Sequence, residues 1–102
     1  MNSPSTPDVV RSEDPNAAQH LQVKIAAAEK LQATMKAANV IVRDRRLSDD
    51  EKVARLVAEC GQRESSARQL LKPDFGGRIG FPDYQLTNNG ANIRRMQQRL
   101  KG

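Results

Sequence analysis

Apolar residues in the first part of the chain recur at steps of three and four, which is the spacing of one face of a helix. Residues 16–43 contain no glycine or proline. Asp14 and Pro15 are residue types preferred at the N-cap and at the first helical position. The apolar positions fall within an arc of about 140°. They are Leu21, Ile25, Ala28, Leu31, Met35, Ala38 and Val42. The pattern predicts a helix over residues 15–43, about 42 Å long at 1.5 Å per residue.

Two shorter helices are predicted downstream. Ser48 and Glu51 form the Ser-x-x-Glu pattern of a capping box, and Gly61 is placed to end the helix that they begin. A third helix is expected over residues 64–71, because Pro73 cannot continue it. The inward positions of these two helices are Val53, Leu56, Val57, Cys60, Ala67, Leu70 and Leu71. Cys60 is therefore expected to act as a small buried hydrophobe.

The segment 73–87 differs in composition from the rest of the chain. It contains all three aromatic residues, Phe75, Phe81 and Tyr84, and three of the six glycines. We expect an ordered loop whose aromatic side chains anchor it to the helices. The sequence leaves a second interpretation open, in which the backbone N–H groups of the loop line a binding pocket together with Arg78.

A final helix is predicted to begin at Thr87 as N-cap, with Asn88 as the alternative. Its buried face consists of Ile93, Met96 and Leu100. A different face, within an arc of about 60°, carries Asn88, Asn92, Arg95 and Arg99. Asparagine is a poor helix former, so three of them within five residues favour a role beyond capping.

Length and pattern together predict one helical domain. A chain of 102 residues is about one domain in size, and it contains no alternating run typical of a strand. We expect an all-α fold: a small bundle of about four helices, with one long N-terminal helix and an ordered Gly- and aromatic-rich loop before the last helix. Residues 14–102 form this domain, and residues 1–13, which include two prolines, are expected to be a disordered tail.

Several classes of protein are disfavoured by what the chain lacks. No apolar run approaches the roughly 18 residues of a membrane span, and the N-terminus has no secretory signal pattern. Cys60 is the only cysteine, so the chain has neither an internal disulfide nor zinc-ligand spacing. The only histidine, His20, has no nucleophile at a motif spacing. We expect a cytoplasmic protein that is not an enzyme and uses no metal or cofactor.

Positive charge is concentrated toward the C-terminus. The net charge is +5, and residues 73–102 carry five basic side chains against two acidic ones. Four of the five are arginine, which suits paired hydrogen bonds to phosphate. The candidate ligand-binding residues are Arg78, Tyr84, Asn88, Asn92, Arg94, Arg95 and Arg99. Guanidinium groups suit phosphates, amides suit base edges and an aromatic ring suits stacking. A solvated helix surface is the alternative interpretation.

The stretch KPDFGGRIGFPDYQLTNNGANIRRMQQRL resembles the C-terminal motif of a family of small phage, prophage and mobile-element proteins of unknown function. That motif runs aromatic, x, Leu, Thr, Asn, Asn, x, Ala, Asn, Ile, Arg, Arg. The likeness extends weakly upstream, over residues 14–100. Gly90 stands where the family usually has another Asn, and Gly76 where Cys is common, which argues against a strictly required role for these two positions. The resemblance implies a setting of conflict between phage and host, and no particular mechanism.

The favoured hypothesis is a counter-defence binding protein. It would capture an anionic ligand, either a nucleotide signal of host immunity or a nucleic acid, through the C-terminal helix and the Gly-rich loop. One alternative is an inhibitor or adaptor that docks on a host defence protein or nucleic-acid-processing complex through the long first helix. Another is a small DNA-binding protein that reads DNA with residues 63–69, because the second and third helices resemble a helix-turn-helix.

The sequence also predicts a homo-oligomer through residues 15–43, because a helix of this length presents more apolar surface than the remaining residues can cover. A strict heptad seam starting at Leu21 would include Gln32 and Asn39, which argues against a simple coiled coil. Analytical ultracentrifugation should therefore detect a dimer or larger species at micromolar concentration. A monomer at that concentration would contradict the prediction.

Overall fold

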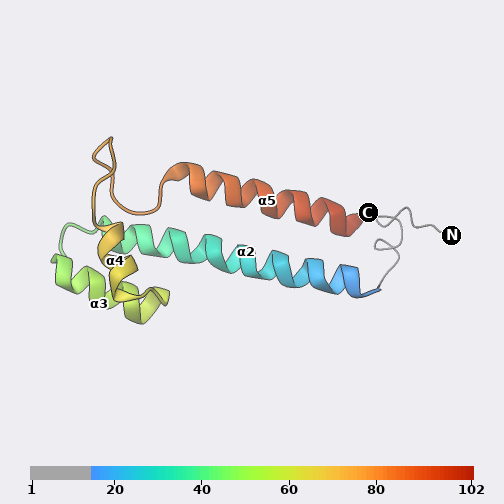
Figure 1. Ribbon diagram of the computed structural model, residues 1–102, viewed down its shortest axis with the longest axis horizontal. Coiled ribbons are helices and arrows are strands. Elements are labelled where there is room, and N and C mark those ends of the chain that lie inside the picture. Colours follow the sequence, from blue (N-terminus) through green and yellow to red (C-terminus); the bar gives the residue numbers. More distant parts are fainter. Residues whose placement is uncertain (1–14) are drawn as a thin grey trace.

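The computed structural model describes residues 15–102, and in this part of the chain it confirms an all-α fold without strands. The four helices are α2 (Pro15–Val42), α3 (Asp49–Cys60), α4 (Glu64–Leu70) and α5 (Asp83–Lys101) (Figure 1). The predicted tail and the predicted N-cap Asp14 lie outside the described residues. None of these four helices is both long and apolar enough to cross a membrane.

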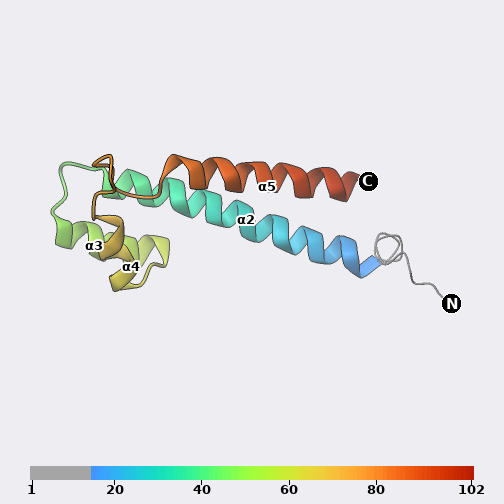
Figure 2. The same ribbon diagram turned by 45° about the horizontal axis from the view of Figure 1, so that its top comes forward.

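The long helix α2 is the support on which the other helices pack. Helix α5 runs antiparallel along it, and the short helices α3 and α4 pack on each other beside its C-terminal half (Figures 1 and 2). The N-terminal half of α2 therefore has α5 as its helical neighbour, without α3 or α4. The candidate ligand-binding residues lie on α5 and on the segment that connects it to α4.

The local sequence signals of α3 are confirmed. The Ser48 Oγ accepts from the backbone N–H of Glu51 at 3.2 Å, and the Glu51 carboxylate accepts from the Ser48 N–H at 2.9 Å. This capping box fixes the start of the helix. The helix ends at Gly61, which has a φ of 65° and so adopts a conformation that favours glycine.

The core lies where α3 and α4 meet the C-terminal half of α2. It consists of the buried residues Ala38, Ile41, Val42, Val53, Leu56 and Ala67. Leu31, which the apolar stripe placed in the core, is 48% exposed, because α3 and α4 do not extend over that part of α2. Cys60 is half-buried against this core, and burial raises the pKa of its thiol, which disfavours the reactive thiolate.

The predicted start of the last helix was wrong. Helix α5 begins at Asp83, so Thr87 and Asn88 lie inside the helix. Pro82 precedes it in an extended conformation, and Asp83 places a carboxylate in the first turn, where the helix dipole favours negative charge. An acidic residue such as Asp83 in the first turn is itself a helix-start signal. The sequence prediction placed the start too late in the chain, because asparagine is a common N-cap residue and several asparagines follow Thr87.

Asn39 ties the connecting segment to α2. This side chain is 8% exposed, and its two polar atoms bind the backbone of one residue. Its Oδ1 accepts from the Phe81 N–H at 2.7 Å, and its Nδ2 donates to the Phe81 carbonyl at 3.1 Å. Gly80 has a φ of 91°, and a Cβ there would overlap the Asn39 amide oxygen. The positive φ and the close approach to Asn39 both require glycine at position 80.

The expectation that three aromatic residues anchor this segment was correct for Phe81 only. Phe81 is partly buried against the core. Phe75 is fully exposed and Tyr84 is 66% exposed. The anchoring is done instead by hydrogen bonds: the Gly80 N–H donates to the Leu70 carbonyl at 2.8 Å, and Asn39 holds Phe81 as described above. Polar contacts therefore replace the aromatic contacts that the composition suggested.

Asn39→Ala should destabilise the protein by about 1–3 kcal/mol, because it removes two hydrogen bonds and leaves the Phe81 backbone groups without these partners. Urea denaturation followed by circular dichroism measures the change. Asn88→Ala is the matched control, since it removes the same side chain from an exposed position of α5, and it should change stability by no more than about 0.5 kcal/mol. Equal losses for the two variants would contradict the role assigned to Asn39.

Candidate anion-binding surface

Five of the predicted site residues lie on one exposed face of α5, which we call the α5 ridge. They are Tyr84, Asn88, Asn92, Arg95 and Arg99, and all are exposed. At 100° per residue they fall within an arc of about 80°, and they extend over about 22 Å along the helix. Tyr84 is expected in the loop from the sequence alone. It belongs to this face because α5 starts at Asp83. The ridge lies beside the face that contacts α2, where Met96 is buried.

The cations of the ridge are free of ion pairs within the described part of the chain. Arg95 and Arg99 form no salt bridge with any residue between 15 and 102. Two arginines of the α2–α4 part of the chain are paired instead: Arg55 with Glu59 at 2.7 Å, and Arg46 with Asp44 at 3.0 Å. The guanidinium groups of the ridge can therefore accept an external anion without first losing a partner.

Two predicted site residues are not part of the ridge. Arg94 is exposed but lies about 100° around the helix from Arg95, and its guanidinium is close to Gly90. Arg78 is exposed on the segment between α4 and α5, where its guanidinium lies near Gly76. The structure therefore brings together five of the seven predicted residues, and places the other two on separate surfaces.

The third asparagine of the cluster has a structural role. Asn89 faces α2, where its Nδ2 donates to the Ala28 carbonyl at 2.9 Å and to the Gln32 Oε1 at 3.0 Å. Gln32 in turn donates to the Leu86 carbonyl at 3.1 Å. Asn89 thus joins the two long helices, and this contact accounts for one of the three asparagines without invoking a ligand. Asn88 and Asn92 remain exposed on the ridge.

The Gly-rich segment does not offer its backbone N–H groups to an anion. The Asp74 Oδ1 accepts from the N–H groups of both Gly76 and Arg78, each at 2.9 Å. The Gly77 N–H donates to the Asp74 carbonyl at 2.9 Å, so the turn is closed by its own groups. The bond from the Arg78 N–H is the main cause that lowers the pKa of Asp74 below its ordinary value. A carboxylate of the chain itself occupies the position that an anionic ligand would need.

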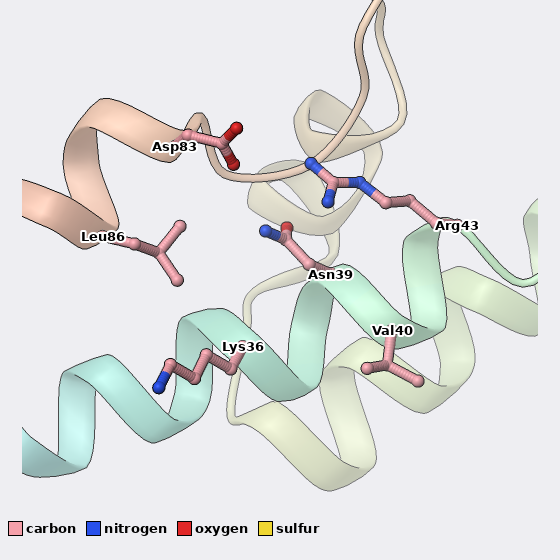
Figure 3. A pocket seen from close by; sticks show the side chains of 6 residues that line it. All are labelled: Lys36, Asn39, Val40, Arg43, Asp83 and Leu86. Atoms are coloured by element: carbon pink, nitrogen blue, oxygen red, sulfur yellow. The ribbon is translucent and has the colours of Figure 1, made fainter.

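A shallow hollow of about 340 Å³ lies between α2 and the start of α5 (Figure 3). It is lined by Lys36, Asn39, Val40, Arg43, Asp83 and Leu86, none of which the sequence prediction had selected. Lys36 and Arg43 are seven residues apart, and this spacing could have identified them as neighbours on one helix face. Because Asp83 adds a carboxylate to the lining, the hollow suits an anion less well than the α5 ridge does.

No protein-family model, curated protein or solved structure matches this chain. Within residues 15–102, no group of three or more His, Cys, Asp or Glu side chains could hold a metal ion. The geometry of the exposed side chains is therefore the basis of the function that we propose below.

Acidification should release the turn at Asp74. Because the folded-state pKa is lowered, the stabilisation of the turn is fully present above the ordinary carboxyl value, and is lost as the pH falls through the lowered pKa. In an NMR titration, the amide signals of Gly76 and Arg78 should shift together with a midpoint below the ordinary aspartate value. Asp74→Asn should abolish this shared transition. Amide signals that titrate independently would contradict the closed turn.

Proposed function

We propose that this protein binds a nucleic-acid strand along the α5 ridge. The observation that carries the proposal is the placement of two unpaired arginines, Arg95 and Arg99, on the same exposed face as Tyr84 and two asparagines. Guanidinium groups bind phosphates, amides bind base edges and an aromatic ring stacks on a base. The ridge supplies all three of these contacts.

The shape of the surface favours a strand over a small nucleotide. Small ligands are usually bound in concave sites that bury most of their surface. The α5 ridge is convex, and the hollow beside α5 contains none of the ridge residues. An exposed row of about 22 Å is instead suited to an extended chain of phosphates.

The alternative of DNA reading by the helix-turn-helix-like pair α3 and α4 has less support. Helix α4 is seven residues long. Its Arg68 is engaged by two carboxylates, those of Glu64 at 3.2 Å and Asp50 at 3.6 Å. Arg68 would first have to leave these two carboxylates to contact DNA, unlike the arginines of the ridge.

The biological setting that we propose is counter-defence by a phage or mobile element, in the cytoplasm of a bacterial host. The resemblance of the C-terminal 30 residues to phage-associated proteins is the support for this setting. Binding to a guide or target strand of a host nuclease complex would be one way for a non-enzymatic protein to act there.

Arg95→Ala combined with Arg99→Ala should weaken binding of a fluorescently labelled single-stranded oligonucleotide by about 100-fold at low salt. Fluorescence anisotropy over a range of salt concentrations measures the effect. Because two phosphate contacts are lost, the slope of log affinity against log salt should decrease in magnitude by about 1.4. The melting temperature should stay nearly unchanged, since exposed arginines contribute little to stability.

Arg46→Ala combined with Arg55→Ala is the matched control, because it removes the same charge from positions that are already ion-paired. This variant should bind within about twofold of the wild type, since neither residue lies on the ridge. If the Arg95 and Arg99 double variant unfolds, these arginines are structural. If it folds and binds normally, the ridge is a solvated surface and α2 becomes the better candidate.

A further inference from the structure

The most exposed large apolar side chain among the described residues is Phe75, at the tip of the segment between α4 and α5. Its exposed fraction is 112%, so it makes no packing contact of note with the rest of the chain. In Figure 1 this segment stands clear of the helices. Deleting the ring would therefore cost the fold little, and the ring is free for contact with another molecule.

The turn that carries Phe75 is held rigidly from within. Two N–H groups bind the Asp74 carboxylate, and the Asp74 N–H donates to the Arg78 carbonyl at 2.8 Å across the turn. Gly77 has a φ of 76°, which a glycine adopts without strain. The ring is thus presented on a turn of defined shape. Because the turn is already ordered, it would lose little conformational entropy when a partner binds.

The base of the turn is also fixed to the helices. The Arg43 Nε donates to the Ile79 carbonyl at 3.3 Å, the Gly80 N–H donates to Leu70, and Asn39 holds Phe81. These contacts come from α2, from the residue that follows it and from the end of α4, so the tip keeps its position relative to the core. A rigid base and a rigid tip are what a docking element needs to bind without rearrangement.

From these observations, we propose that Phe75 is an anchor that inserts into an apolar pocket with an acidic rim on a partner protein. An aromatic side chain that fills a partner's pocket is a common centre of binding energy in interfaces. The charges that flank Phe75 in the chain indicate the chemistry of the pocket rim. Lys72 and Arg78 are exposed and form no ion pair within the described residues. The Asp74 carboxylate, by contrast, is engaged by backbone N–H groups. Cationic flanks favour carboxylates on the partner.

Two other occupants fit the geometry less well. The hollow between α2 and α5 of a second copy is lined by two cations, Lys36 and Arg43, against one carboxylate, that of Asp83. Its net positive charge would repel the two cations that flank Phe75. A nucleic-acid strand is bound by an aromatic ring together with a row of phosphate-binding and base-binding groups, and such a row lies on the α5 ridge and not around Phe75. The tip is also separate from the α5 ridge in sequence, and none of the ridge residues takes part in the proposed contact, so this inference does not depend on the proposed function.

The test uses the full chain with Phe75→p-azidophenylalanine, a photoreactive replacement of similar shape, in the native host cell. We expect one protein adduct, and mass spectrometry should map it to a peptide at an apolar pocket flanked by Asp or Glu. Unlabelled wild type should compete for the adduct, and so should Tyr84→Ala, which is altered on the ridge only. Phe75→Ala should compete about tenfold less well or worse, as expected for the loss of a hot-spot aromatic.

The remaining outcomes overturn the proposal. An adduct with nucleic acid makes Phe75 part of the strand-binding surface, and an adduct with a second copy makes it a dimer contact. No adduct, or equal competition by Phe75→Ala, removes the anchor role. Phe75→Ala should also keep the wild-type melting temperature, and unfolding of this variant would show that the ring is structural. Oligonucleotide binding by Phe75→Ala should be unchanged, which separates failure here from failure of the ridge.

Discussion

The two hydrogen bonds between Asn39 and the backbone of Phe81 are the constraint on which the arrangement of this protein depends. Asn39 comes from α2, and Phe81 is the last residue but one before α5 begins. Holding both backbone groups of one residue fixes its position and orientation relative to α2. The position at which α5 starts relative to α2 follows from this placement. The close approach also explains Gly80, where a side chain would collide with the Asn39 amide.

The contact between the two long helices is more polar than a typical helix pair. Besides buried apolar residues such as Met35 and Met96, it contains the network of Gln32, Asn89 and the Leu86 carbonyl. Polar contacts of this kind specify register, because a shift of one helix along the other would leave several partly buried groups without partners. Apolar contacts alone tolerate such a shift more readily. The polar network therefore serves to define which residues of α5 face outward.

A division of roles along the C-terminal part of the chain follows. Phe81, Asn89 and Met96 are used by the fold, whereas Phe75, Tyr84, Arg95 and Arg99 contribute little to it. Exposed aromatic and unpaired arginine side chains on rigid supports are the residue types that interfaces use most. The two surfaces that we propose, the α5 ridge and the Phe75 turn, would allow one small protein to bind a nucleic-acid strand and a protein partner at the same time. Such a combination suits an adaptor or inhibitor of a nucleic-acid-processing complex.

The sequence by itself determined the local elements of this protein. The long helix, the capping box at Ser48 and the glycine that ends α3 follow from residue preferences that act within a few positions. The face shared by Asn88, Asn92, Arg95 and Arg99 also follows, because helical periodicity alone defines it.

Only the tertiary structure decided which polar residues are structural. Gln32 and Asn39 interrupt the apolar seam of α2, and their partners are backbone groups more than 40 residues away in the chain. Helical periodicity places Asn89 on the predicted buried face, away from Asn88 and Asn92. Its hydrogen-bond partners on α2 lie more than 50 residues away in the chain, so only the tertiary structure shows them. The sequence could not predict the exposure of Leu31 and Phe75 either. That of Leu31 depends on how far α3 and α4 extend along α2, and that of Phe75 on a turn closed by Asp74. Burial is a property of the assembled helices, and local preferences carry no information about distant partners.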